Sequence, residues 1–260
     1  MNFARLIIFP AAACIVSCSG MPLIDSGSGK EKEAVARSER LYQSAVWTER
    51  LRSVDELSEC RGKDALRFFV RAASDRHERI RIAAVRALAQ MQNNASYGAL
   101  LDIAKTDENQ NVRWEVLKAI SPFKRKESAE IFETYLNDSD WLVREASVSG
   151  YLSIDDPKVK SEAADIAVTA LNDPNESVRI AALHGYSGTD PRVYAFASKQ
   201  IAGGAYYRRT GYLKVLLETI SRYKLDSQMR TAVLQYITHP NGEVRVLALQ
   251  AVKKSDEREK

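Results

Sequence analysis

The sequence predicts an all-α protein, an α-solenoid of about six helix–turn–helix repeats. A short pattern recurs at intervals of 31 to 35 residues, a period typical of solenoids. After each copy, apolar residues follow at helical spacing. No stretch alternates apolar and polar residues as a half-buried strand would. In such an architecture each repeat buries its apolar face against its neighbours only.

The recurring pattern is a turn residue, an aliphatic residue five positions later, and an arginine directly after that. The aliphatic residues, which we number position 0, are Ile80, Val112, Val143, Val178 and Val244. Positions +4, +5 and +8 are almost all apolar, and position +7 is always Ala or Gly. The last interval, 66 residues, is about twice the others, so we expect a degraded copy with Tyr207-Arg208 in place of the aliphatic-Arg pair.

A further helix is expected before each copy, which makes the repeat a helix–turn–helix unit. Asp-Pro pairs at 156–157, 173–174 and 190–191 punctuate the joins. The expected first helices span residues 64–73, 96–105, 127–137, 158–171, 192–202 and 227–238.

Two helices joined by an Asp-containing turn, followed by Val-Arg and a column of small residues, resemble the HEAT repeat in its short bacterial form. The resemblance covers about residues 60–254. It implies a right-handed α-solenoid, and in function a scaffold that holds a protein partner in a curved groove. Some HEAT-like proteins are enzymes, such as bilin lyases and DNA glycosylases, so an enzyme or enzyme chaperone of the lyase type is the alternative.

The sequence carries no motif for catalysis or for a bound cofactor. His-Glu-x-x-His, paired cysteines, Gly-rich phosphate loops and serine nucleophile elbows are all absent. Most acids that can be placed lie at helix starts, where a carboxylate caps backbone N–H groups. We therefore expect no metal, no cofactor and no enzymatic activity.

The first residues resemble the signal peptide of a bacterial lipoprotein. Residues 6–16 are almost wholly apolar and lead to Ile15-Val16-Ser17-Cys18, which is similar to a lipobox. The resemblance implies cleavage before Cys18, acyl chains on that residue, and a membrane-anchored protein of the bacterial cell envelope that faces the periplasm or the cell surface. An ordinary secretory signal with a chance cysteine, or an uncleaved anchor, is the alternative.

The expected domain organisation follows from these segments. Residues 1–17 form the signal peptide, and the Ser/Gly-rich residues 18–33 form a flexible tether. Residues 34–59 are helical but lack the Val-Arg pair, so we interpret them as atypical capping helices before the solenoid at 60–254. A charged tail spans 255–260. Cys60 is interpreted as a buried thiol, with an intermolecular disulfide as the alternative.

The arginine at position +1 lies about 100° from position 0, inside the apolar arc of the helix. An unpaired charge should not recur there, so we expect these arginines to bond turn acids or carbonyls of the same or adjacent repeats, which resembles the Asp–Arg ladder of HEAT proteins. The arginines are Arg81, Arg113, Arg144, Arg179 and Arg245, and the candidate acids are Asp75, Asp107, Asp138 and Asp173.

Position +2 is expected to point away from the core, yet four of its five residues are apolar. A row of exposed apolar side chains often marks an interaction surface, and Trp is enriched at binding hot spots. Alternatively, neighbouring second helices pack side by side and bury this column. The candidate partner-binding residues are Ile82, Trp114, Ile180 and Val246 at position +2, with Lys118 and His184 at position +6.

A basic and aromatic stretch surrounds the degraded copy. Such a mixture can bind nucleic acid or another polyanion, or its tyrosines can pack between repeats. We favour packing and expect no nucleic-acid partner. The candidate patch comprises Tyr206, Tyr207, Arg208, Arg209 and Tyr212 within the wider stretch 206–224.

Overall fold

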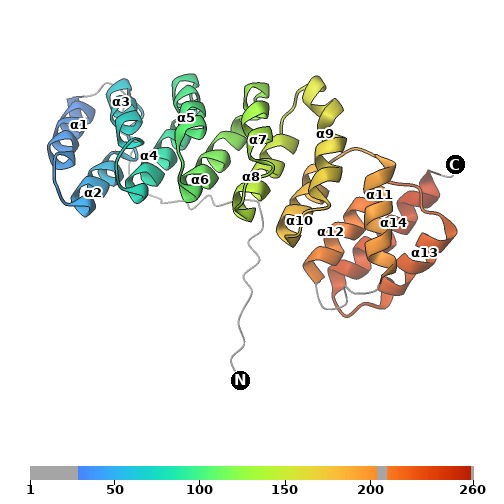
Figure 1. The fold of residues 1–260 in the computed structure, drawn as a ribbon. Helices are drawn as coiled ribbons and strands as arrows, with labels where there is room; N and C mark the ends of the chain where they lie inside the picture. The colour runs from blue at the N-terminus through green and yellow to red at the C-terminus, as the bar shows by residue number, and fades with distance from the viewer. Residues whose placement is uncertain (1–28, 204–209, 259–260) are drawn as a thin grey trace.

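The structure, a computed structural model, describes residues 29–203 and 210–258. Within those ranges it contains 14 α-helices, short 3-10 segments and no strand. The chain is therefore an all-α solenoid, as the sequence predicts. Figure 1 shows the helices stacked in pairs along an elongated molecule.

Each repeat is a pair of helices, and the pairs form two rows (Figure 1). The first helices are α1 (Gly29–Tyr42), α3 (Lys63–Ala72), α5 (Asn94–Thr106), α7 (Ala129–Tyr135), α9 (Pro157–Ala170), α11 (Pro191–Ala202) and α13 (Ser227–Leu234). The second helices are α2 (Trp47–Leu57), α4 (Glu78–Met91), α6 (Gln110–Ile120), α8 (Trp141–Leu152), α10 (Glu176–Gly185), α12 (Thr210–Ile220) and α14 (Gly242–Glu257). The 3-10 segments are η1 (Ser121–Phe123), η2 (Lys126–Ser128) and η3 (Gln235–Thr238).

The row of second helices forms the inner side of the solenoid. Adjacent second helices pack against each other more extensively than adjacent first helices do. Closer packing on one side shortens that side, so the row α2 to α14 is the concave one. We call its solvent-facing side the inner face.

Most second helices begin where a side chain caps the first turn. Asn109, Asp140, Asn175 and Asn241 each accept a hydrogen bond from a backbone N–H two residues further on. Such N-caps typically stabilise a helix by about 1 kcal/mol. Because each cap lies three residues before position 0, it also fixes where the helix starts relative to the apolar column.

The apolar columns form the core as the spacing predicts. The position 0 residues Ile80, Val112, Val143, Val178 and Val244 are at most 1% exposed. Position +7 is small because another side chain crosses there. A Cβ built on Gly150 would lie 2.1 Å from the ring of Phe132.

The degraded repeat is real, but its position 0 is Tyr212 and not Tyr207. Tyr212, Leu216, Leu217 and Ile220 are buried at 0, +4, +5 and +8, the same pattern as in α6. Leu213, which is 0% exposed, stands where the other repeats have arginine. The sequence pattern was misleading because Tyr207-Arg208 imitates the aliphatic-Arg pair five residues too early.

The structure also moves two predicted boundaries. Helix α1 begins at Gly29, so residues 29–33 are not part of a tether. Glu31 is 3% exposed, and its carboxylate accepts a 2.8 Å hydrogen bond from the N–H of Gly62, the residue that caps α3. At the other end, α14 extends through Glu257 and includes the first residues of the expected tail. Cys60 is a free thiol with 0% exposure.

Candidate functional site

The predicted arginine ladder is present along the turns that precede the second helices. In each rung an arginine at position +1 pairs with the aspartate at position −5 of the next repeat. The rungs are Arg81–Asp107 at 2.7 Å, Arg113–Asp138 at 3.0 Å and Arg144–Asp173 at 2.7 Å. These side chains are at most 17% exposed. The ladder therefore ties consecutive repeats together and is structural.

The Arg81 and Arg144 rungs share one local geometry, whereas Arg113 donates to the carbonyl of Glu108 and pairs with Asp138 by charge alone. In Arg144, Nη1 donates to the carbonyls of Asp138 and Ser139 at 2.8 and 3.1 Å. Nε and Nη2 of the same guanidinium donate to the carboxylate of Asp173. Asp173 also accepts from the N–H of Asn175 at 2.7 Å. Burial raises the pKa of Asp173, but these donors outweigh it and lower the pKa overall.

A rung that the sequence analysis missed lies at the start of the solenoid. Arg50 in α2 pairs with Asp75 at 2.8 Å and donates to the carbonyls of Ser44 and Ala45. Position 0 of this repeat is Glu49, so the aliphatic-Arg signature is missing although the arginine is present. Helices α1 and α2 therefore join the solenoid through the same contact as the later repeats.

The ladder ends at Arg179. Its Nη1 donates to the carbonyls of Asp173 and Pro174, but no acid of the described chain pairs with it. The sequence has no Asp or Glu from Pro191 to Leu217, and Tyr207 occupies position −5 of the degraded repeat. In the last repeat, His239 holds position −5 and its Nδ1 accepts from the N–H of Asn241 at 3.1 Å, as the aspartates do.

Other arginines hold the repeats beyond this break. Arg222 donates to the carbonyls of Leu183 and Tyr186 at the end of α10. Arg258 donates to the carbonyls of Ser221 and Tyr223 after α12. Both arginines bind at the C-terminal ends of second helices, where the helix dipole interacts favourably with a positive charge.

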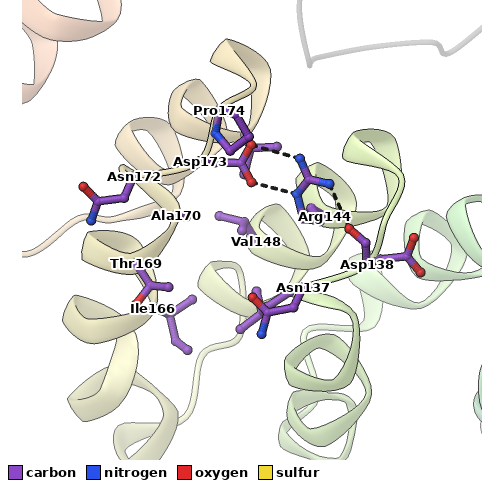
Figure 2. A pocket seen from close by; sticks show the side chains of 12 residues that line it. Asn137, Asp138, Arg144, Val148, Ile166, Thr169, Ala170, Asn172, Asp173 and Pro174 are labelled. Carbon is purple, nitrogen blue, oxygen red and sulfur yellow. Dashed lines mark hydrogen bonds and ion pairs between the residues drawn. The ribbon is translucent and has the colours of Figure 1, made fainter.

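The cavity beside the Arg144–Asp173 rung is a packing gap between repeats. It has a volume of about 370 Å³ and lies between α8 and α9, with Val148 and Ile166 in its wall. Figure 2 shows Arg144 and Asp173 facing each other at its edge, with their bonds drawn as dashed lines. Because these two charges pair with each other, neither is available to a ligand in the cavity.

The candidate partner-binding residues lie on the inner face, but position +2 is only partly open. Ile82, Trp114 and Ile180 are half-buried and pack against the core, whereas Val246 is 52% exposed. Adjacent second helices thus cover one side of this column and leave the other side in solvent. At position +6, Lys118 and His184 are exposed.

Trp114 and Lys118 form a small polar–aromatic cluster. The Lys118 amine lies 4.0 Å from the centre of the Trp114 ring, a cation–π contact. Glu145, the position +2 residue of α8, is half-buried, and its burial raises its pKa while Ser149 and Lys118 oppose that shift. In α4, by contrast, Arg86 is committed to Glu115 at 2.9 Å. Lys118 is therefore an exposed cation beside an aromatic ring.

Two hollows open beside the inner-face columns. One, of about 510 Å³, lies between α12 and α14 and is lined by Lys214, Glu218, Val246, Leu247 and Gln250 among others. The second, of about 410 Å³, lies where α4 and α6 end and includes Lys118 and Phe123. Positions +2 and +6 thus line the first hollow through Val246 and Gln250, and position +6 lines the second through Lys118.

Tyr212 is the one residue of the candidate basic and aromatic patch that the structure describes, and it packs in the core, as the favoured interpretation expects. Tyr212 is 2% exposed and belongs to the core, because it fills position 0. Lys214 pairs with Glu243. Tyr206, Tyr207, Arg208 and Arg209 lie outside the described residues.

Cys18 and the predicted signal peptide also lie outside the described residues. No helix of the described chain is long and apolar enough to cross a membrane. Across residues 29–203 and 210–258, no group of three or more His, Cys, Asp or Glu side chains could hold a metal ion.

Comparison with known families finds one match. A model of HEAT repeats matches residues 36–121 and 97–187, which together cover more than half of the chain. The first of these matches includes α2, in agreement with the Arg50–Asp75 rung. No curated protein matches the chain.

Several solved structures are similar in fold. The X-ray structure of YibA from E. coli aligns with a TM-score of 0.51 at 17% identity, over 88% of this chain and 96% of that chain. Human deoxyhypusine hydroxylase, solved in complex with glycerol, aligns with a TM-score of 0.43 at 17% identity, over 87% and 97% of the two chains. A computationally designed armadillo repeat protein for modular peptide recognition aligns with a TM-score of 0.43 at 16% identity, over 85% and 99%. At these identities the likeness concerns fold alone.

Proposed function

Because the chain belongs to the HEAT-repeat family, we propose that it is a non-catalytic scaffold that binds a protein partner along its inner face. The observation that carries this proposal is the combination of apolar and charged groups around Trp114. Its half-buried ring lies under the exposed Lys118 amine, and both stand on the concave row of helices. Aromatic side chains of this kind, anchored on one side and open on the other, are typical of binding hot spots.

The chemistry of this surface indicates the kind of segment that binds there. Trp114 in α6, Ile180 in α10 and Val246 in α14 offer apolar contacts on every other helix of the inner row. Lys118 offers a cation, which favours a partner with a carboxylate. We infer that the partner presents apolar side chains with an acidic residue among them.

The proposed location of this scaffold is the bacterial cell envelope. The support is the sequence Ile15-Val16-Ser17-Cys18 after an apolar run, which resembles a lipobox. Acyl chains on Cys18 would hold the protein on a membrane, since each buried CH₂ contributes about 0.8 kcal/mol. The solenoid begins at Gly29, so it would lie close to that membrane.

Charge reversal at Lys118 tests the scaffold proposal. Trp114 packs against the core, so replacing it would also lower stability, whereas Lys118 is exposed and its reversal should leave the fold intact. Crosslinking in source cells, followed by affinity purification from detergent extracts, should recover a partner with the wild-type protein and much less of it with Lys118→Glu. The matched control is Lys105→Glu, a charge reversal at another exposed lysine, on α5 in the outer row. Equal recovery with both variants would contradict the proposal.

A further inference from the structure

The residue at position +5 of each second helix lies on the side that packs against the next repeat. In six helices this residue is at most 1% exposed. The six are Val54, Val85, Leu117, Val148, Leu183 and Leu217. The equivalent residue of α14 is Leu249, which is 55% exposed. Helix α14 therefore presents a packing face, with no repeat of the described chain on it.

The same face carries an arginine held in the ladder orientation. Nη1 of Arg245 donates to the carbonyls of His239 and Pro240 at 2.8 and 3.0 Å, as Nη1 of Arg144 does in its own turn. In Arg144 this orientation directs Nε and Nη2 at the carboxylate of the next repeat. For Arg245 no acid of residues 29–203 or 210–258 takes that place. Arg245 thus presents a donor pair oriented to receive a carboxylate.

The N-terminal end of the solenoid does not complement this face. Position −5 of the first repeat is Ser44, not an acid. In α6 the residue at position +3, Glu115, contacts Arg86 of the preceding repeat. The residue at the same position in α2 is Arg52, whose side chain is 73% exposed. A second copy stacked head to tail would therefore set a serine against Arg245 and a charge near Leu249.

Two copies meeting tail to tail fit no better. An antiparallel α14 pair centred on Leu249 would bring Arg245 of one copy against Lys253 of the other. Like charges in direct apposition oppose association.

We propose that the end face of α14, formed by Arg245 and Leu249, docks a helical hairpin of a partner protein. The four rungs Arg50–Asp75, Arg81–Asp107, Arg113–Asp138 and Arg144–Asp173 show what covers such a face. The hairpin places a carboxylate from its turn on Arg245 and an apolar helix side on Leu249. This end face is separate from the Trp114 region, so it does not depend on the scaffold proposal.

Photo-crosslinking of the full chain tests this inference. With p-benzoylphenylalanine in place of Leu249, irradiation of source cells should give a crosslink to another protein. Peptide mapping should place it in a helix pair whose connecting turn carries Asp or Glu. The matched control has p-benzoylphenylalanine in place of Val70, which is 43% exposed on α3 in the outer row. Irradiation of this control should give no such crosslink.

A charge-reversal variant distinguishes this specific contact from nonspecific binding to an exposed apolar residue. Arg245→Glu should lower the yield at position 249 about tenfold, which corresponds to 1.4 kcal/mol, and replacing the mapped partner acid with Lys should restore it. Arg245 is exposed, so the melting temperature of the variant should remain near that of the wild type. A crosslink to a second copy of this chain would overturn the proposal, as would equal yields at positions 249 and 70 or a yield unchanged by Arg245→Glu.

Discussion

The Arg50 guanidinium and the Asp75 carboxylate lie 2.8 Å apart, and their side chains are only 7% and 5% exposed. Asp75 also accepts hydrogen bonds from the Tyr42 hydroxyl at 2.8 Å and from the N–H of His77 at 2.9 Å. One carboxylate thus connects α1, α2 and the turn before α4. A buried pair of this kind is costly to break on one side, because the remaining charge stays desolvated.

The first prediction concerns the response of this rung to acid. Burial alone would raise the pKa of Asp75, but the bonds from Arg50, His77 and Tyr42 hold it at about 2. A carboxyl whose pKa is lower in the folded state stabilises the fold above its ordinary pKa near 3.9. That stabilisation, about 2 kcal/mol, should therefore be lost as the pH falls from about 4 to about 2.

Urea unfolding at a series of pH values measures this effect. Asp75→Asn should be less stable than the wild type at pH 6 and should show a flatter decline between pH 4 and 2.5. Glu145→Gln is a suitable comparison, because burial raises the pKa of Glu145 and its contribution has the opposite sign. Parallel pH profiles for the wild type and Asp75→Asn would show that Asp75 is not held by this network.

The second prediction compares a complete rung with an incomplete one. Arg144→Ala leaves Asp173 buried without its partner, so we expect a loss of about 3 kcal/mol. Arg179→Ala removes hydrogen bonds to carbonyls and a weaker charge attraction to Asp173, and should cost about 1 kcal/mol. Chemical denaturation of both variants gives the comparison. Equal losses would mean that the carbonyl bonds, and not the ion pairs, hold the turns.

The third prediction uses two glycines in helices. A Cβ at Gly150 would overlap the Phe132 ring, so Gly150→Ala should destabilise the protein by about 1–3 kcal/mol. At Gly98 nothing lies within 4 Å of an added Cβ, and Gly98→Ala should stabilise by about 0.5–1 kcal/mol through its helix propensity. Thermal unfolding should thus shift in opposite directions for the two variants. A stabilising Gly150→Ala would contradict the packing of α7 on α8.

The fourth prediction concerns Cys18. If this residue is acylated, Cys18→Ala should abolish the mature lipid-modified form. Mass spectrometry of the N-terminal peptide from purified membranes measures the modification directly. An unmodified N-terminus at another position would refute lipidation.

The fold could be predicted from the sequence because each repeat has apolar residues at the same helical positions. The ladder was predictable for the same reason, since an arginine inside an apolar arc requires a partner. Arg50 was missed because Glu49 breaks the aliphatic-Arg signature. The degraded repeat was placed five residues early because Tyr207-Arg208 resembles that signature, whereas the burial of Tyr212 depends on neighbours distant in sequence.

The candidate site was harder to predict than the fold. Periodicity gives the direction of a side chain around its own helix, but not how closely the adjacent helix approaches. Position +2 was therefore expected to be either exposed or buried, and for Ile82, Trp114 and Ile180 the structure shows an intermediate exposure. Leu249 is exposed because α14 is the last described helix. The sequence pattern does not predict this, because position +5 is apolar in α14 as it is in the other second helices.

The loss of the ladder after Arg179 makes the contacts between repeats uneven along the solenoid. Helices α10 and α12 pack less extensively than any other adjacent second helices, and arginine–carbonyl bonds replace the ion pair there. In a stack coupled only between nearest neighbours, deformation concentrates at the weakest junction. We therefore expect the five repeats before this junction to move as one unit relative to the two after it. Small rotations at α10–α12 would widen or narrow the span between Trp114 and Val246.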